Sequence, residues 1–209
     1  MGILERKERS KVDIKKKILE AAKELFIQRG FTETSVRNIA EKIEYSPTTI
    51  YLYYKDKNAI FHAIHDEGFG LLKDSLKILY NVHNPIERLK AIIRVYVNFA
   101  LENKELYELM FILEAPLNSI EPSEENWEEG QKSFDILKST VDECLEAGFF
   151  KGYTSENLSF ILWSAVHGMC SLQIKGRSEK VFSVENAHRV LLEGIETLNK
   201  FLDQIKSIS

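Results

Sequence analysis

Apolar residues recur at helical spacing along almost the whole chain. Between residues 13 and 29 they stand at Ile14, Ile18, Ala21 and Leu25, on one face of a helix with 3.6 residues per turn. No segment alternates apolar and polar residues in the way that a half-buried strand requires. The pattern therefore predicts an all-α protein of about nine helices.

Residues that favour helix ends divide this pattern into separate helices. Gly30 is a typical C-terminal stop, and Thr34 or Ser35 is suited to capping the next helix. Ser46 caps a third helix in the same way, with Pro47 at its first position. The remaining helices are expected at about 56–82, from 85, from 103 to 116, and at 123–147, 155–174 and 183–205. The stretch "APLNSIEPSEEN" at 115–126 is the clearest loop.

The composition is that of an ordinary globular protein. The chain has 209 residues, of which 44% are hydrophobic and 29% are charged, enough to bury a sizeable core. No run of about 18 apolar residues predicts a membrane span, and no apolar stretch follows the basic N-terminus as a secretory signal would. The two cysteines, Cys144 and Cys170, fall inside helical patterns. Reduced thiols and a cytoplasmic location are expected.

The charge is distributed unevenly. The first 60 residues carry 13 basic and 9 acidic residues, a net +4, and the remaining 149 carry 15 and 23, a net −8. A basic end on an acidic body suggests an anionic partner, although a solvated charged helix gives the same count. The basic tail, with Arg6, Lys7, Arg9 and Lys11, either adds contacts to such a partner or is a frayed, solvated terminus.

The first three helices have the spacing of a helix-turn-helix. Two short helices joined by a tight turn follow a longer helix, and the second short helix contains "SPTTIYLYY". In this motif the second helix lies in the major groove of DNA. Threonine hydroxyls and methyls can meet base edges, and tyrosine hydroxyls can reach phosphate oxygens. Tyr54 is expected in the core. Tyr51 and Tyr53 are expected on the surface, because a helix with all three tyrosines buried would have no face exposed to solvent.

Residues 14–64, "IKKKILEAAKELFIQRGFTETSVRNIAEKIEYSPTTIYLYYKDKNAIFHAI", resemble the DNA-binding domain of TetR-family transcriptional repressors. The most specific part is "GF" followed by "TSVRNIA" and then "TIYLYYKDK". The resemblance implies an all-α homodimer whose three N-terminal helices bind DNA and whose C-terminal bundle dimerises and holds a small-molecule inducer. The expected domains are residues 1–57 and 58–209.

The resemblance also implies a set of DNA contacts. Arg37 would touch phosphate or a base, Lys57 would bind phosphate, and the remaining contacts come from the second short helix. The full DNA-binding set is Arg37, Pro47, Thr48, Thr49, Tyr51, Tyr53 and Lys57. Many members of the family have glycine at the position of Pro47 or Thr48, so the bases that this chain reads are open.

The segment "LSFILWSAVHGMCSLQIKG" is apolar on two opposite faces of one helix. A helix of this kind is packed between two neighbours. The face with small residues suits close contact with a second subunit, together with the last helix, in a four-helix interface with two-fold symmetry. The predicted interface residues are Ile161, Ala165, Gly168, Leu172, Leu191, Gly194, Leu198 and Leu202.

The opposite face carries Trp163 and His167. Here "LWSAVHGMCSL" resembles the Trp-x3-His-Gly motif of one branch of TetR-family C-terminal domains. An apolar pocket with a few polar groups is typical of small-molecule sites. The predicted ligand-binding residues are Tyr96, Phe99, Met110, Phe111, Phe134, Trp163, His167 and Cys170. The alternative is a filled aromatic core in which His167 is a satisfied buried histidine.

No sequence feature favours catalysis. His62 and His65 are three positions apart on one helix but lack a nearby cysteine or carboxylate partner, so surface histidines are expected and no metal site. There is no Gly-rich phosphate loop, nucleophile elbow or zinc-ligand spacing, and neither an enzyme nor a cofactor is predicted.

The sequence thus predicts a ligand-responsive repressor that binds a near-palindromic DNA operator as a homodimer and is released by a small, largely apolar effector. Activation instead of repression is also compatible with the sequence. One alternative is a constitutive DNA-binding regulator whose C-terminal body serves only dimerisation. A second is an all-α enzyme or interaction module that keeps a helix-turn-helix as a scaffold.

Overall fold

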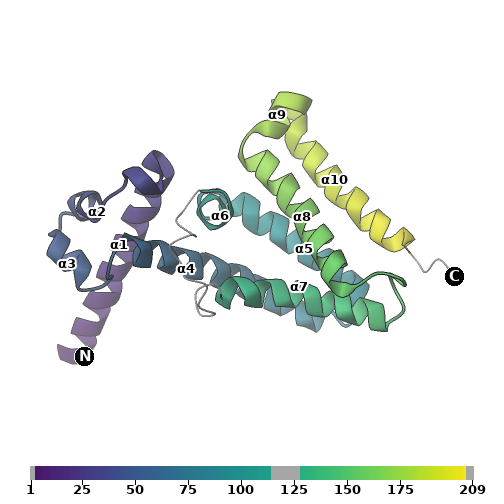
Figure 1. Ribbon diagram of the computed structural model, residues 1–209, viewed down its shortest axis with the longest axis horizontal. Helices are drawn as coiled ribbons and strands as arrows, with labels where there is room; N and C mark the ends of the chain where they lie inside the picture. The colour runs from purple at the N-terminus through teal and green to yellow at the C-terminus, as the bar shows by residue number, and fades with distance from the viewer. Residues whose placement is uncertain (1–2, 114–127, 206–209) are drawn as a thin grey trace. The chain divides into compact units, whose positions relative to one another are not determined.

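The computed structural model describes residues 3–113 and 128–205 (Figure 1). All regular structure in these two ranges is helical, which confirms the all-α prediction. The α-helices are α1 (Ile3–Glu33), α2 (Val36–Lys42), α3 (Pro47–Tyr51), α4 (Lys57–Lys77), α5 (Pro85–Glu102), α6 (Lys104–Phe111), α7 (Glu128–Glu146), α8 (Ser155–Ile174), α9 (Arg177–Phe182) and α10 (Val184–Gln204). A 3-10 helix, η1 (Ile78–Asn81), follows α4. The predicted loop at 115–126 lies outside the described ranges.

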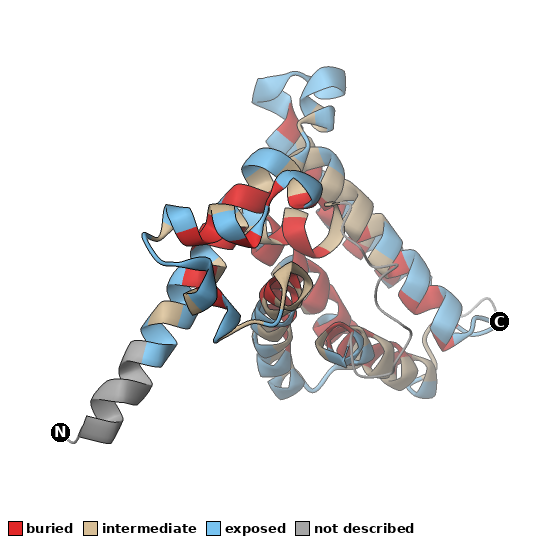
Figure 2. Ribbon diagram, turned by 60° about the vertical axis from the view of Figure 1, so that its left-hand side comes forward, coloured by how far each residue is buried: buried red, intermediate tan, exposed pale blue. Residues whose placement is uncertain are grey.

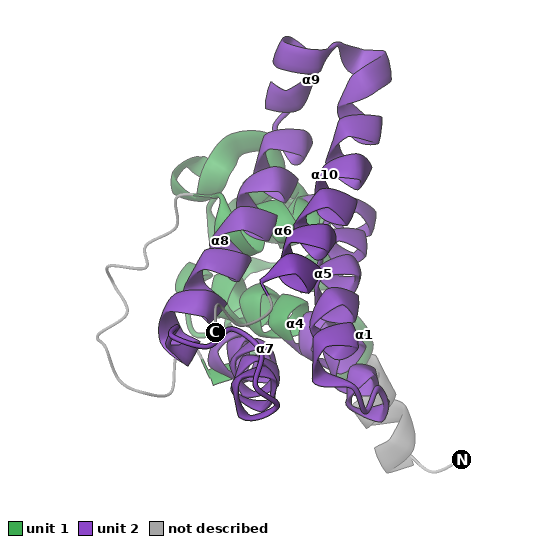
Figure 3. Cartoon of the chain, turned by 90° about the vertical axis from the view of Figure 1, so that its right-hand side faces the viewer, with its two compact units in different colours: residues 1–69, 105–128 green, residues 70–104, 129–209 purple. Residues whose placement is uncertain are grey.

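The chain forms two compact units (Figure 3). Unit 1 comprises residues 1–69 and 105–128, and unit 2 comprises residues 70–104 and 129–209. Helix α4 begins in unit 1 and ends in unit 2, and α6 returns the chain to unit 1. The compact unit that contains α1 to α3 thus extends past residue 57. The functional boundary after residue 57, between a DNA-binding and an effector domain, stays a prediction.

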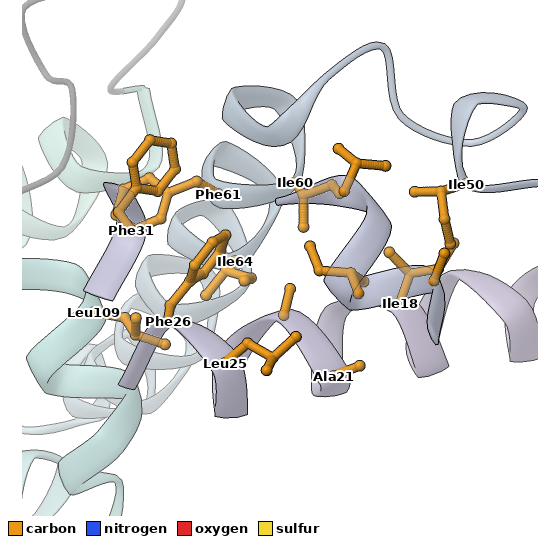
Figure 4. Packing of buried hydrophobic residues seen from close by; sticks show 14 residues of the cluster. Ile18, Ala21, Leu25, Phe26, Phe31, Ile50, Ile60, Phe61, Ile64 and Leu109 are labelled. Carbon is orange, nitrogen blue, oxygen red and sulfur yellow. The ribbon is translucent and has the colours of Figure 1, made fainter. Parts of the chain in front are cut away.

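Unit 1 is built on an apolar cluster contributed by α1, α2, α3, α4 and α6. Ile18, Phe26, Ile39, Ile50 and Ile60 are fully buried in it (Figure 4). The cluster includes three phenylalanine rings whose centroids lie 5.2 to 5.7 Å apart. Burial of side chains of this size stabilises a fold by about 1.5–3 kcal/mol each, so the cluster holds the short helices α2 and α3 in place.

The short helices of unit 1 begin at capping residues. Ser35 and Asn38 form a reciprocal capping box at the start of α2, and the Ser46 hydroxyl accepts a hydrogen bond from the Thr49 N–H at the start of α3. Of the two predicted caps for α2, Ser35 is correct and Thr34 is wrong. The Thr34 side chain instead is buried and donates to carbonyl oxygens of α1.

Helix α1 is longer than its apolar pattern predicted. It begins at Ile3 and ends at Glu33, and it contains a break at Gly30, where φ is 80° and ψ is 167°. Only glycine adopts this backbone conformation readily, since any Cβ would be strained there. The predicted stop at Gly30 is confirmed, because helical φ and ψ are interrupted there and only a short second helical segment follows to Glu33.

Unit 2 is organised around α5, which packs against α8 and α10. Buried positions follow one side of its helices, visible as red stripes in Figure 2. Two buried cations of α5 are neutralised within the unit: Arg88 pairs with Glu143, and Lys90 pairs with Asp203 at 2.5 Å. A buried charge without a partner is strongly destabilising, and both of these charges have one.

No helix in the described part of the chain is long and apolar enough to cross a lipid bilayer.

Candidate DNA interface and effector site

Helix α3 has one buried side and one open side. Ile50 is fully buried and fixes the helix on the core of unit 1. Pro47, Thr48 and Tyr51 are exposed, with 55% of Tyr51 accessible, whereas Thr49 is half-buried. The Thr49 hydroxyl lies 3.0 Å from the Ser46 hydroxyl, which orients it at the N-terminus of the helix. The predicted contact residues on α3 therefore share a surface that is available to a partner.

The three tyrosines of this region have different environments. Tyr53 and Tyr54 both pack partly against the core of unit 1, which was expected only for Tyr54. Burial, together with the nearby carboxylate of Glu67, raises the pKa of Tyr54, so its phenol stays protonated. Tyr51 is thus the most open tyrosine of the three, and Tyr53 presents only part of its ring.

Arg37 of α2 is the most exposed cation of the predicted set. Its side chain is 80% accessible, and its guanidinium Nε lies 3.2 Å from a carboxylate oxygen of Glu41, one turn later. An exposed pair of this kind contributes less than about 1 kcal/mol, so the guanidinium can exchange this carboxylate for a phosphate at little cost.

Lys57 is held by the carbonyl end of α1. Its ammonium donates hydrogen bonds to the carbonyl oxygens of Phe31 at 2.6 Å, Thr34 at 2.6 Å and Thr32 at 3.3 Å. It also lies 4.2 Å from the centroid of the Phe31 ring. An ammonium group has three N–H donors, and these bonds use all of them. Lys57 therefore has a structural role that the sequence did not indicate. The phosphate contact predicted for it is untested, and it competes with these three bonds for the same N–H groups.

His65 is buried, which corrects the expectation of a surface histidine. It is 8% exposed, and its Nε2 lies 2.8 Å from the carbonyl oxygen of Leu109 in α6. Burial lowers the pKa of His65 to about 4, although the carbonyl of Leu109 partly offsets this effect. A neutral imidazole that donates to a carbonyl joins α4 to α6 within unit 1. No group of three or more metal-ligating side chains occurs in the described ranges.

In unit 2 the structure joins several of the predicted effector-site residues. The Tyr96 hydroxyl lies 3.2 Å from Nδ1 of His167, whose Nε2 lies 3.2 Å from the Ser171 hydroxyl. The Trp163 ring is 6.0 Å from His167 and meets Phe134 edge-on at 5.8 Å. Burial lowers the pKa of His167, so the imidazole is neutral near pH 7 and can pass a hydrogen bond between the two hydroxyls.

Ser171 was not predicted from the sequence. It stands four positions after His167, and this helical spacing was the signal that could have identified it.

The other predicted effector-site residues fall into two groups. Phe99 and Cys170 are buried in unit 2, and burial raises the pKa of the Cys170 thiol to about 12. Met110 and Phe111 belong to unit 1, where Phe111 packs against Phe69 at 5.3 Å. Six of the eight predicted residues therefore share unit 2, and two do not.

The predicted dimer face is open on α8 and mixed on α10. Ile161 is 59% exposed and Leu172 is 54% exposed, and a Cβ added at Gly168 would meet no atom within 4 Å. Ala165, Gly194 and Leu198 are partly accessible. Leu191 and Leu202 are buried inside unit 2, with 6% and 3% of their surface exposed. They would therefore hold the interface helix in place without contacting the second subunit.

Helix α10 exposes other apolar side chains than those predicted. Leu192 is 45% exposed and Phe201 is 55% exposed. These two residues extend the apolar surface beyond the predicted set.

A helix-turn-helix with an exposed second helix, carried by an all-helical chain, defines the class of helix-turn-helix transcriptional regulators. Comparison with known proteins specifies the family. Residues 18–64 match the family described as "Bacterial regulatory proteins, tetR family", and residues 89–195 match "Tetracyclin repressor-like, C-terminal domain". The chain belongs to the TetR family of transcriptional regulators.

Individual relatives agree with this assignment. The HTH-type transcriptional regulator RutR of Escherichia coli O157:H7 is 27% identical over 201 residues, covering 87% of this chain and 90% of RutR. A bacterial regulatory protein of the tetR family from Rhodococcus RHA1 has a similar fold, with a TM-score of 0.73, 19% identity, and coverage of 93% of this chain and 98% of that one.

A third similar structure is the transcriptional regulator FadR of Bacillus subtilis in complex with stearoyl-CoA. Its TM-score is 0.69 at 19% identity, and the match covers 84% of this chain and 94% of FadR. At this level of identity the similarity concerns the fold.

Proposed function

We propose that this TetR-family regulator is a repressor that binds a near-palindromic operator as a homodimer and is released by a small, largely apolar effector. The observation that carries the DNA-binding part is the open side of α3, where Thr48 and Tyr51 are exposed around a helix fixed by the buried Ile50. Threonine and tyrosine hydroxyls suit base edges and phosphates in a major groove.

Dimerisation sets the geometry of the operator. The exposed apolar side chains of α8, including Ile161 and Leu172, support contact with a second copy. A two-fold dimer presents two copies of α3, and these enter successive major grooves when the half-sites are about 34–36 Å apart, or a multiple of that distance. An operator with two-fold symmetry follows.

In vitro selection from a random duplex library tests this part. We expect the selected sequences to share an inverted repeat. We expect Thr48→Ala to weaken binding of the selected duplex by at least about 30-fold, since one base contact of about 1–3 kcal/mol is lost in each of the two half-sites. Glu179→Ala, an exposed substitution in α9, is the matched control and should leave binding unchanged. Selection of no common sequence would contradict the proposal.

The effector part rests on the polar chain inside unit 2. Tyr96, His167 and Ser171 are linked by hydrogen bonds beside the aromatic rings of Trp163 and Phe134. A few polar groups among aromatic rings are typical of sites that bind largely apolar molecules. A ligand that replaces one of these internal hydrogen bonds would shift the helices that carry them.

Helix α6 offers a route from such a shift to the DNA-binding helices. It starts at Lys104, directly after α5, and within unit 1 its Leu109 carbonyl is bonded to His65 of α4. Met110 packs so closely on Gly68 of α4 that an added Cβ would lie 2.5 Å from its sulfur. A displacement of α6 is therefore passed to α4, whose first residue, Lys57, holds the end of α1.

Two measurements test the effector part. Mass spectrometry of the chain purified from its host should reveal a co-purified small molecule. Stearate and stearoyl-CoA are suitable probes, because a protein of similar fold binds the latter. A probe that binds should lower operator affinity by about 5- to 150-fold, and the operator should lower probe affinity by the same factor. The variant Tyr96→Phe, which keeps the ring and loses the hydroxyl, should reduce this coupling.

The alternative is a constitutive regulator without an effector. The near-complete burial of Tyr96, Phe99 and Cys170 favours it, because side chains packed this tightly fill a core. This alternative would be supported if the purified protein carries no small molecule and if neither probe changes its affinity for the operator.

A further inference from the structure

Leu52 has an unusual position for a large apolar side chain. It is 79% exposed, the highest value among the large hydrophobic residues of 11–113 and 128–205, where side-chain exposure is described. It directly follows α3, and its backbone remains helical, with φ −71° and ψ −20°. Its N–H donates to the carbonyl of Thr49 at 3.2 Å, so the residue is fixed at the end of the helix.

The side chain of Leu52 lies on the side of the helix opposite the core. A helix turns by about 100° per residue, so Thr48 stands about 160° and Leu52 about 200° from the buried Ile50. Thr48 and Leu52 are thus neighbours, one turn apart, at the centre of the open side of α3. The half-buried Thr49 and the exposed Tyr51 flank them.

Single exposed leucines are common on protein surfaces and need no explanation by themselves. Leu52 differs because its neighbours are the hydroxyl-bearing residues proposed to face DNA. A leucine side chain has no hydrogen-bond donor or acceptor, so it cannot read the polar edges of bases. The major groove contains one apolar feature that it can read, the 5-methyl group of thymine.

We propose that Leu52 contacts the 5-methyl group of a thymine in each operator half-site and is a specificity-determining residue. This inference rests on the proposed function, since it requires that α3 enters the major groove. Thr48 then reads a polar base edge, and Leu52, one turn further along, reads a methyl group.

The test removes the methyl group without changing base pairing. Each thymine of a duplex selected by the wild-type protein is replaced in turn by deoxyuridine, and affinities are measured for the wild type and for Leu52→Ala. At one thymine per half-site we expect deoxyuridine to weaken wild-type binding about fourfold, the effect of exposing one methyl-sized group. For Leu52→Ala the same replacement should change affinity by less than about 1.5-fold, because its methyl contact is already lost.

A matched control is Leu71→Ala, which truncates a leucine of α4 in unit 2 that is 47% exposed. It should keep the wild-type response to deoxyuridine. Because Leu52 is almost fully accessible, Leu52→Ala should keep the wild-type thermal midpoint, which shows that any change in binding is local.

Three outcomes would overturn the proposal. If no thymine shows a response that depends on Leu52, the leucine does not read a methyl group, although DNA binding through α3 stands. If Leu52→Ala instead changes the sedimentation of the free protein and leaves operator binding intact, its partner is another protein chain. If the wild type selects no duplex, the proposed function fails together with this inference.

Discussion

The substitution Lys57→Met tests the role that the structure gives to this lysine. The change removes the ammonium and keeps an unbranched, flexible side chain. The wild-type ammonium is bonded to three carbonyl oxygens at the end of α1 and in the following turn, two of them at 2.6 Å. In the variant these carbonyls lose a charged donor.

The expected magnitude follows from these contacts. A hydrogen bond to a charged group contributes about 1.5–3 kcal/mol, and bonds to a single ammonium are not additive. Lys57 is only half-buried, so water replaces part of what is lost. We expect a destabilisation of about 2–4 kcal/mol, a large part of the 5–15 kcal/mol typical of a domain, and a thermal midpoint lower by roughly 5–15 °C.

Operator affinity as a function of salt separates this role from a phosphate contact. Each phosphate neutralised by a lysine contributes about 0.9 to the slope of log K against log salt. We expect Lys57→Met, at a temperature where it is folded, to keep the wild-type slope. The exposed neighbour Lys55 is the matched control: Lys55→Met should keep the thermal midpoint. A variant Lys57→Met with wild-type stability and a slope reduced by about 1.8, one phosphate contact from each of the two subunits, would refute the structural role.

Three further predictions concern stability and reactivity. The pKa of His65 is about 4 in the folded chain and near 6.5 in a free imidazole, so the unfolded state takes up a proton first as pH falls. The free energy of unfolding should therefore drop by about 3 kcal/mol between pH 6.5 and 4. Urea unfolding of His65→Leu should lack this pH dependence. Burial raises the pKa of both Cys144 and Cys170 to about 12, so a thiol reagent at pH 8 should modify neither in the native state and both in urea. Gly30→Ala should destabilise by roughly 1–3 kcal/mol in urea unfolding because φ there is 80°, whereas Gly70→Ala, at a helical site with open space for a Cβ, should be neutral or stabilising.

Local signals in the sequence predicted much of the fold. Ser46 and Pro47 define the start of α3, and Pro85 starts α5, because capping and proline geometry depend on a few consecutive residues. The burial of Ile50 and the exposure of Tyr51 follow from helical periodicity in the same way. Helix α9 was missed: it has only six residues, too few to show a period.

The contacts of Lys57 and His65 that the sequence did not indicate are long-range. The carbonyl partners of Lys57 lie 23 to 26 positions earlier in the chain, and the partner of His65 lies 44 positions later. These partners cannot be recognised in the sequence, because a residue of any type has a backbone carbonyl. The sequence therefore predicts a phosphate contact for Lys57 and surface exposure for His65, whereas in the structure both side chains are bonded to backbone carbonyls.

The placement of Met110 and Phe111 has a similar cause. Both are among the predicted ligand-binding residues, and Met110 is 5% exposed. Periodicity identifies the buried side of a helix but not the core that receives it. Only the three-dimensional structure shows that α6 belongs to unit 1.

Hydroxyl-radical footprinting of the selected operator, combined with sedimentation analysis of the complex, tests the central claim most directly. Two chains should bind one duplex and protect two half-sites centred about one helical turn, or a whole number of turns, apart on one face of the DNA. Thr48→Ala should weaken both protected regions equally. Protection of a single site by one chain, or protection that Thr48→Ala leaves unchanged, would contradict a dimer that reads DNA through the open side of α3.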